Sequence, residues 1–220
     1  MFHFKKPVLY FQRRMNCYER LTAVVMLGSA LAGCQPSVSD SPVADAEVGI
    51  ATQSKSALAS LDYGQSPRIH HDASGRVQVE LSSAWSQDGL LVIRGIFTPD
   101  DAGFHLYSSS LPKEGVSGLG RPTLIEVSDS ATFQDVGPLV SAEEPFSHHD
   151  ETLDITLPIY HSGAVTLYLP LRFRALPQAP TQVPIRLTYM ACSDMRCNSP
   201  VEGAAEEVTS PLPVGDFVER

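Results

Sequence analysis

The sequence predicts an all-β domain built as an antiparallel sandwich or barrel, preceded by an N-terminal segment of different composition. Seventeen prolines and fifteen glycines among 220 residues favour many short strands and turns over long helices. From Arg76 onward, apolar and polar residues alternate with a period of two, which is typical of strands that bury one face. No stretch of twelve or more residues in this part has the spacing of an amphipathic helix.

The expected strands follow one another with turn residues between them. The alternation is clearest over residues 77–81, and Asp88-Gly89 then marks a turn. Further strands are expected over residues 90–97, 103–108, 123–127, 153–157, 165–173, 183–190 and 201–208. Pro170 lies inside one of these ranges. Because proline has no amide hydrogen to donate, that strand is expected at a sheet edge or at a bulge.

The first 33 residues have the composition of an export signal. Basic residues precede an apolar run over residues 21–33, which is thirteen residues long and therefore too short to cross a bilayer comfortably. The run ends in Leu31-Ala32-Gly33-Cys34, which resembles the lipobox of bacterial lipoproteins. The resemblance implies a signal peptide over residues 1–33 and acyl chains on Cys34, which together give durable anchoring. The alternatives are a plain secretory signal or a short membrane anchor, and Met15 is a second candidate start.

Residues 34–75 are predicted to be a lipidated cysteine followed by a flexible tether. They are rich in Ser, Ala, Asp and Pro without sustained apolar periodicity, although a short helical turn is expected around residues 56–61. Such a tether reaches roughly 35 Å. The folded domain is expected over residues 76–212, with a tail over 213–220. The predicted location is the cell envelope, facing the periplasm. Gln35, rather than the aspartate that commonly retains lipoproteins at the inner membrane, favours the outer membrane.

Charge and motif spacing exclude several kinds of ligand. Five of the sixteen basic residues and one of the 25 acidic residues lie in the signal, so its removal leaves a net charge of −13, which repels nucleic acid. The glycines of residues 115–120 precede no predicted helix, so we expect no nucleotide cofactor. His70-His71 and His148-His149 have no cysteine or carboxylate at ligand spacing, and we expect solvated loop histidines and no metal.

Two cysteines remain as free thiols once the signal is removed and Cys34 is acylated. Cys192 and Cys197 follow a predicted strand, and the four residues between them allow a tight turn that brings the sulfurs to bonding distance. A disulfide closing so short a loop stabilises a domain by only about 2 kcal/mol. Arg196 favours the Cys197 thiolate, whereas Asp194 opposes ionisation of either sulfur. On these residues alone, a structural clasp and a redox pair are equally open.

The segment VPIRLTYMACSDMRCNSPVE, residues 183–202, resembles the cysteine-bearing segment of one known family. That family is the N-terminal periplasmic domain of the thiol:disulfide interchange protein DsbD. The segment AGFHLYSSSLP, residues 102–112, is similar to the family's G-x-x-L-Y stretch, with Tyr107 on its tyrosine and His105 on an aromatic position. The resemblance covers roughly residues 76–210. It implies an immunoglobulin-like sandwich whose dithiol passes electrons to periplasmic oxidoreductases.

The resemblance also implies roles for individual residues. Cys197 would form the mixed disulfides with partner proteins, and Cys192 would resolve them. A cap loop with an acidic pair and a phenylalanine shields the sulfurs in the family, and Glu143, Glu144 and Phe146 are the candidates here. The run Asn198-Ser199-Pro200 departs from the family, which often has an apolar residue and two prolines after the second cysteine.

Two hypotheses follow for function. In the first, the chain is a stand-alone lipoprotein and a thiol:disulfide oxidoreductase component, which relays reducing equivalents through Cys192 and Cys197. Because the chain holds neither a polytopic membrane domain nor a thioredoxin-like domain, the expected partners are thioredoxin-like periplasmic proteins or a polytopic membrane thiol transporter. In the second hypothesis, the chain is a non-enzymatic, lipid-anchored binding or assembly module with a static disulfide.

Overall fold

The computed structural model describes residue 50 and residues 53–64, 66–151 and 154–213. The predicted signal peptide, the lipidated Cys34 and residues 214–220 of the tail lie outside this part. Within it, no helix is long and apolar enough to cross a membrane.

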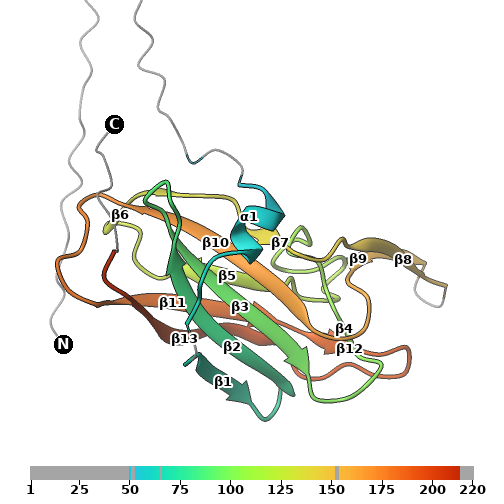
Figure 1. Cartoon of the computed structure of the whole chain (residues 1–220). Helices are drawn as coiled ribbons and strands as arrows, with labels where there is room; N and C mark the ends of the chain where they lie inside the picture. Colours follow the sequence, from blue (N-terminus) through green and yellow to red (C-terminus); the bar gives the residue numbers. More distant parts are fainter. Residues whose placement is uncertain (1–49, 51–52, 65, 152–153, 214–220) are drawn as a thin grey trace, which may run out of the picture. The chain divides into compact units, whose positions relative to one another are not determined.

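The folded part consists of two antiparallel sheets that face each other (Figure 1). The larger sheet has the order β1 (Arg68–Asp72), β2 (Val77–Trp85), β3 (Leu91–Pro99), β10 (Val165–Phe173) and β6 (Phe133–Val136), and β7 (Val140–Ser141) also pairs with β10. The smaller sheet has the order β13 (Val201–Ser210), β11 (Thr181–Tyr189) and β5 (Leu124–Val127). Two further pairs are β4 (His105–Leu106) with β12 (Ala191–Cys192) and β8 (Phe146–Asp150) with β9 (Ile155–Ile159). The all-β antiparallel sandwich, immunoglobulin-like in kind, is therefore confirmed.

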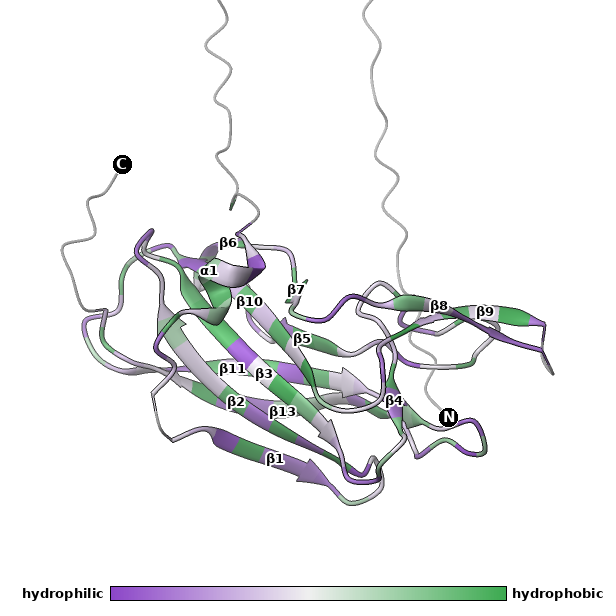
Figure 2. Ribbon diagram, turned by 45° about the vertical axis from the view of Figure 1, so that its right-hand side comes forward, coloured by the Kyte–Doolittle hydropathy of each residue, from purple (hydrophilic) through white to green (hydrophobic). Residues whose placement is uncertain are grey.

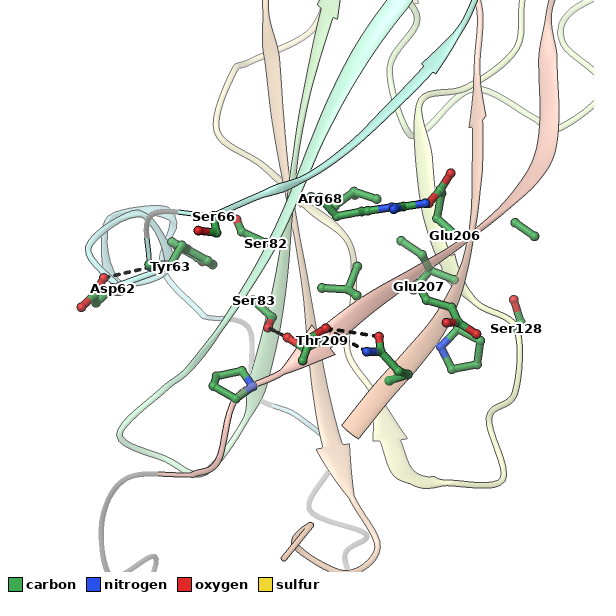
Figure 3. A pocket seen from close by; sticks show the side chains of 18 residues that line it. Asp62, Tyr63, Ser66, Arg68, Ser82, Ser83, Ser128, Glu206, Glu207 and Thr209 are labelled. Atoms are coloured by element: carbon green, nitrogen blue, oxygen red, sulfur yellow. Dashed lines mark hydrogen bonds and ion pairs between the residues drawn. The ribbon is translucent and has the colours of Figure 1, made fainter. Parts of the chain in front are cut away.

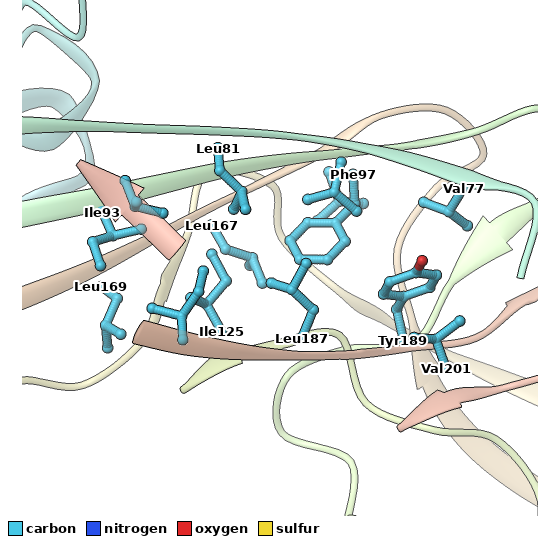
Figure 4. Close-up of a cluster of buried hydrophobic side chains, with 14 of the residues drawn as sticks. Val77, Leu81, Ile93, Phe97, Ile125, Leu167, Leu169, Leu187, Tyr189 and Val201 are labelled. Atoms are coloured by element: carbon cyan, nitrogen blue, oxygen red, sulfur yellow. The ribbon is translucent and has the colours of Figure 1, made fainter. Parts of the chain in front are cut away.

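The core lies between the two sheets because alternate residues of each strand point inward. Figure 4 shows Leu81, Phe97 and Leu167 from the larger sheet packed against Ile125, Leu187 and Tyr189 from the smaller one. The rings of Phe97 and Tyr189 meet edge to face, with centroids 5.8 Å apart. Gly95 permits the close approach of the sheets, since a Cβ atom there would lie 2.6 Å from Ile125 Cδ1.

Pro170 does not make β10 an edge strand, because β10 lies between β3 and the strands β6 and β7. The Pro170 carbonyl accepts a hydrogen bond from the Gly137 amide (2.9 Å), so this side of the residue faces the break between β6 and β7. The missing amide hydrogen therefore falls where the neighbouring strand is interrupted. A register shift against β6 follows at Arg172 and Phe173, so the predicted irregularity is present although the predicted edge is not.

The predicted tether is too long at its C-terminal end. Helix α1 (Lys55–Ala59) begins behind the N-cap Ser54, and Leu58 is buried in a small cluster against Tyr63 and Tyr168. Strand β1 then pairs with β2 over all five of its residues. Residues 54–64 and 66–72 are therefore part of the folded domain. The sequence of β1, RIHHD, has no apolar alternation, and its pairing depends on backbone hydrogen bonds that side chains do not reveal.

The four histidines that the sequence placed in loops lie on strands instead. His70 on β1 hydrogen bonds to Glu206 (2.9 Å) and to the Tyr189 hydroxyl (3.1 Å), and it thereby links β1 to β13 and β11 of the smaller sheet. His148 and His149 lie on β8. In the part of the chain that the structure describes, no three His, Cys, Asp or Glu side chains are grouped to hold a metal ion.

Candidate functional site

Cys192 and Cys197 are joined by a disulfide across a tight hairpin at the end of β12. The Ser193 amide donates to the Arg196 carbonyl (2.8 Å), and the amide of residue 198 donates to the carbonyl of residue 191 (2.9 Å). Cys192 and Cys197 therefore form a non-hydrogen-bonded pair, with one backbone hydrogen bond on each side of it. In antiparallel strands, the Cα atoms of such a pair lie closer together than those of a hydrogen-bonded pair. Their Cα atoms are 4.0 Å apart.

The two cysteines differ in exposure. Cys192 is only 2 % exposed, whereas Cys197 is exposed. The Tyr107 hydroxyl donates a hydrogen bond to Cys192 Sγ (3.1 Å). Burial, and to a lesser degree the charge of Asp150, raise the pKa of Tyr107, so its hydroxyl stays protonated and remains a donor. A partner molecule thus meets Cys197 first, and Cys192 is held behind it.

The β8–β9 hairpin closes the buried side of the disulfide. Leu157 and Ile159 of β9 pack in one cluster with Tyr107, Leu111 and Cys192. Figure 2 shows this hairpin standing out from the sandwich at the end that carries β4, with apolar residues along β9. The apolar face of the hairpin therefore lies against the region around Cys192 and contributes to its burial.

His105 lies directly opposite Cys192 in the pairing of β4 with β12. Its ring meets the Tyr107 ring edge to face, with centroids 5.6 Å apart, and the His148 ring lies 6.1 Å away. Burial lowers the pKa of His105, and His148 lowers it further, while Asp194 acts in the opposite direction. The structure therefore brings together four of the predicted residues: Cys192, Cys197, Tyr107 and His105.

The side chain of Arg196 contacts the loop between β3 and β4, whereas its position next to Cys197 in the sequence suggested that it stabilises the Cys197 thiolate. Its guanidinium donates to the Asp101 carboxylate (3.1 Å) and lies 5.4 Å from the centre of the Phe104 ring. Arg76 donates to the same carboxylate (2.9 Å). Arg196 thus ties the cysteine hairpin to the loop between β3 and β4, and the Asp101 charge offsets any support that Arg196 gives to a Cys197 thiolate.

The three candidate cap residues contact other parts of the domain. Glu143 accepts the amide of residue 166 on β10 (2.8 Å), and Glu144 forms an ion pair with Lys55 of α1. The Phe146 ring stacks on His161 with centroids 4.4 Å apart, and Phe146 is 38 % exposed. The hydrogen bonds, ion pairs and ring contacts described for these side chains do not reach the sulfurs. Their role as a cap stays a prediction.

Three residues near the site were missed by sequence reasoning. His148 was expected in a loop but lies on β8, whose sequence FSHHD has no apolar alternation to indicate a strand. The sequence around Asp101 did not indicate its contact with the cysteine hairpin, because its partner Arg196 lies 95 residues away in the sequence. Met195, at the tip of the hairpin, is 92 % exposed. A large apolar side chain in a four-residue turn was the available signal for that position.

A polar hollow of about 880 Å³ lies away from the cysteines, between the two sheets at the edge formed by β2 and β13 (Figure 3). Arg68 and Glu206 form an ion pair in it (3.1 Å), and the Ser83 hydroxyl donates to the Thr209 carbonyl (2.8 Å). These groups therefore bond to each other within the hollow.

Comparison with known proteins gives matches in structure alone. No protein-family model matches the sequence, and no curated protein matches it. The N-terminal periplasmic domain of ScsB from Proteus mirabilis is similar with a TM-score of 0.43 and 15 % identity, over 66 % of this chain and 52 % of that one. The N-terminal domain of DsbD from Neisseria meningitidis, in the reduced form, is similar with a TM-score of 0.41 and 18 % identity, over 64 % of this chain and 90 % of that one. This chain therefore spans about half the length of the ScsB chain.

Proposed function

We propose that Cys192 and Cys197 form a redox-active pair that relays reducing equivalents in the bacterial envelope. The supporting observation is the unequal exposure of the two sulfurs, with Cys192 only 2 % exposed and Cys197 open to solvent. Thiol–disulfide exchange needs one sulfur that a partner can reach and a second one that attacks from within. The proposed partners are thioredoxin-like periplasmic proteins or a polytopic membrane thiol transporter.

The proposed reaction has two displacements. The Cys197 thiolate attacks one sulfur of the partner's disulfide, a mixed disulfide forms, and the partner's other sulfur leaves as a thiolate. The Cys192 thiolate then attacks Cys197 Sγ, and the partner's second sulfur leaves. Two electrons have passed to the partner, and Cys192 and Cys197 are again joined by a disulfide. The same steps run backwards when a reduced partner regenerates the dithiol.

A static clasp is the second candidate, with the chain as a non-enzymatic binding or assembly module. The burial of Cys192 is compatible with this role, because a shielded sulfur is hard for reductants to attack. The short loop argues against stabilisation as the main role of the disulfide, since closing a loop of about six residues contributes only about 2 kcal/mol.

A redox titration separates the two candidates. The full chain is equilibrated with dithiothreitol buffers of graded potential, and its thiols are counted by alkylation and mass spectrometry. A relay is expected to have a reduction potential above about −300 mV, whereas a structural bond lies below that value. The double variant Cys192→Ala, Cys197→Ala is the control and is expected to show no transition in this range. A potential below about −300 mV would rule out the relay.

We further propose that Cys34 carries the lipid anchor and that the domain faces the periplasm, with the outer membrane favoured. The support is the sequence Leu31-Ala32-Gly33-Cys34 behind a short apolar run. Labelled palmitate is expected to enter the wild-type chain and to be absent from Cys34→Ser, which should leave the membrane fraction. Equal labelling of both chains would contradict the anchor.

A further inference from the structure

We infer that His105 accepts the proton of the Cys192 thiol in the second displacement of the exchange reaction. The inference rests on the proposed function and assigns a proton-accepting group to that site. His105 and Cys192 are opposite each other in the β4–β12 pairing. Opposite residues of antiparallel strands have Cβ atoms about 4.5–5.5 Å apart on the same face, so one water molecule can connect an imidazole nitrogen of His105 to the Cys192 sulfur.

A proton acceptor is needed because Cys192 is buried. Burial in apolar surroundings, here beside Leu111, Leu157 and Ile159, disfavours a thiolate. The Cys192 thiol must therefore lose its proton before its sulfur can attack. The Tyr107 hydroxyl stabilises the thiolate by its hydrogen bond to Sγ, but it does not take the proton, since the pKa of Tyr107 is raised.

The surroundings of His105 keep its imidazole neutral and ready to accept a proton. The titratable groups that face it are Cys192 and Asp194 from the cysteine hairpin, His148 from β8, and Tyr107, which directly follows β4. Burial and the neighbouring His148 lower the pKa of His105, and Asp194 opposes this shift without cancelling it. Asp194 also offers a nearby negative charge once the imidazole becomes positive.

The step balances as follows. The Cys192 S–H bond breaks and its proton passes to neutral His105, while Cys192 becomes a thiolate. The thiolate attacks Cys197 Sγ, the Cys192–Cys197 bond forms, and the bond between Cys197 and the partner's sulfur breaks. The partner leaves as a thiolate. His105 passes its proton to that thiolate or to solvent water and returns to its neutral form, and the two electrons reside on the partner.

The two displacements can be timed separately with 5,5′-dithiobis(2-nitrobenzoate) as the disulfide. The full chain carries Cys17→Ser and Cys34→Ser so that the pair alone reacts, and it is reduced before mixing. Attack by Cys197 releases the first nitrothiobenzoate at a rate proportional to the reagent concentration. Attack by Cys192 releases the second at a rate independent of that concentration.

The variants His105→Phe and His105→Gln test the inference, and His149→Phe is the matched control on the opposite face of β8. At pH 7 we expect the second release to slow by about 10- to 100-fold in both His105 variants. The first release should stay within about twofold, which also reports that the variants are folded. The wild-type second rate should be flat from the pKa of His105 up to that of the thiol, whereas the variants should rise about tenfold per pH unit.

His148→Phe gives a signature that a purely structural role would not produce. Since His148 lowers the pKa of His105, removing His148 should raise that pKa. The fall of the second release rate on acidification should then occur at a higher pH than in the wild-type chain. An unchanged second rate in His105→Phe and His105→Gln would overturn the inference and leave the relay intact. If the wild-type chain fails to release the second nitrothiobenzoate at all, the proposed relay itself fails.

Discussion

The variant Cys192→Ala is expected to accumulate as a covalent adduct with an oxidised thioredoxin-like protein. Cys197 remains exposed and reactive in this variant, so the first displacement proceeds. The second displacement has lost its nucleophile. An intramolecular thiol acts as though present at a very high effective concentration, and its loss leaves only slow attack by thiols in solution. The adduct should appear on a non-reducing gel as a one-to-one complex that dithiothreitol dissolves.

The matched control for this trap is Cys197→Ala. This variant retains Cys192, which is 2 % exposed and lies behind the β8–β9 hairpin and Tyr107. A partner's disulfide cannot reach that sulfur without opening the site, so the adduct should form at less than about a tenth of the rate seen for Cys192→Ala. Equal trapping by the two variants would contradict the proposed division of roles, and trapping by neither would remove the support for a relay.

Replacing Phe97 with alanine is expected to destabilise the domain by about 3–5 kcal/mol. Phe97 is fully buried between the sheets, and its ring packs edge to face on Tyr189. The substitution removes most of a buried side chain and leaves a cavity that the two sheets cannot collapse to fill. This loss is a large fraction of the roughly 5–15 kcal/mol by which domains are stable. Equilibrium unfolding in urea, with the disulfide intact, measures the change.

Phe146→Ala is the control of the same residue type for this measurement. Phe146 is 38 % exposed on β8 and stacks on His161. Its truncation should cost about 1 kcal/mol or less, because Phe146 lies at the surface with 38 % of its area already exposed to water. If Phe97→Ala cost no more than Phe146→Ala, the packing of the two sheets around Phe97 would be wrong.

Strands with strong alternation were predictable from the sequence, and strands held mainly by backbone pairing were not. Val77, Val79 and Leu81 are all fully buried, as their alternation with polar residues indicated. Strand β1 reads RIHHD and β6 reads FQDV, and neither carries a sustained apolar pattern. Both pair with strands of the larger sheet through backbone hydrogen bonds, which are available to any residue other than proline. Strand β1 was assigned to the tether for this reason, because its sequence carries no apolar pattern.

For the cysteine pair, too, one property was predictable from the sequence and another depends on the tertiary structure. Five positions of separation and a turn-forming sequence were enough to predict that Cys192 and Cys197 approach each other, because closing a short hairpin is a local event. Which sulfur is buried and which is open depends on contacts from distant segments. Tyr107 reaches Cys192 across 85 residues of sequence, and Asp101 reaches Arg196 across 95. Those contacts depend on how the sheets and hairpins pack together in the folded domain. A local pattern of side chains in the sequence does not predict that packing.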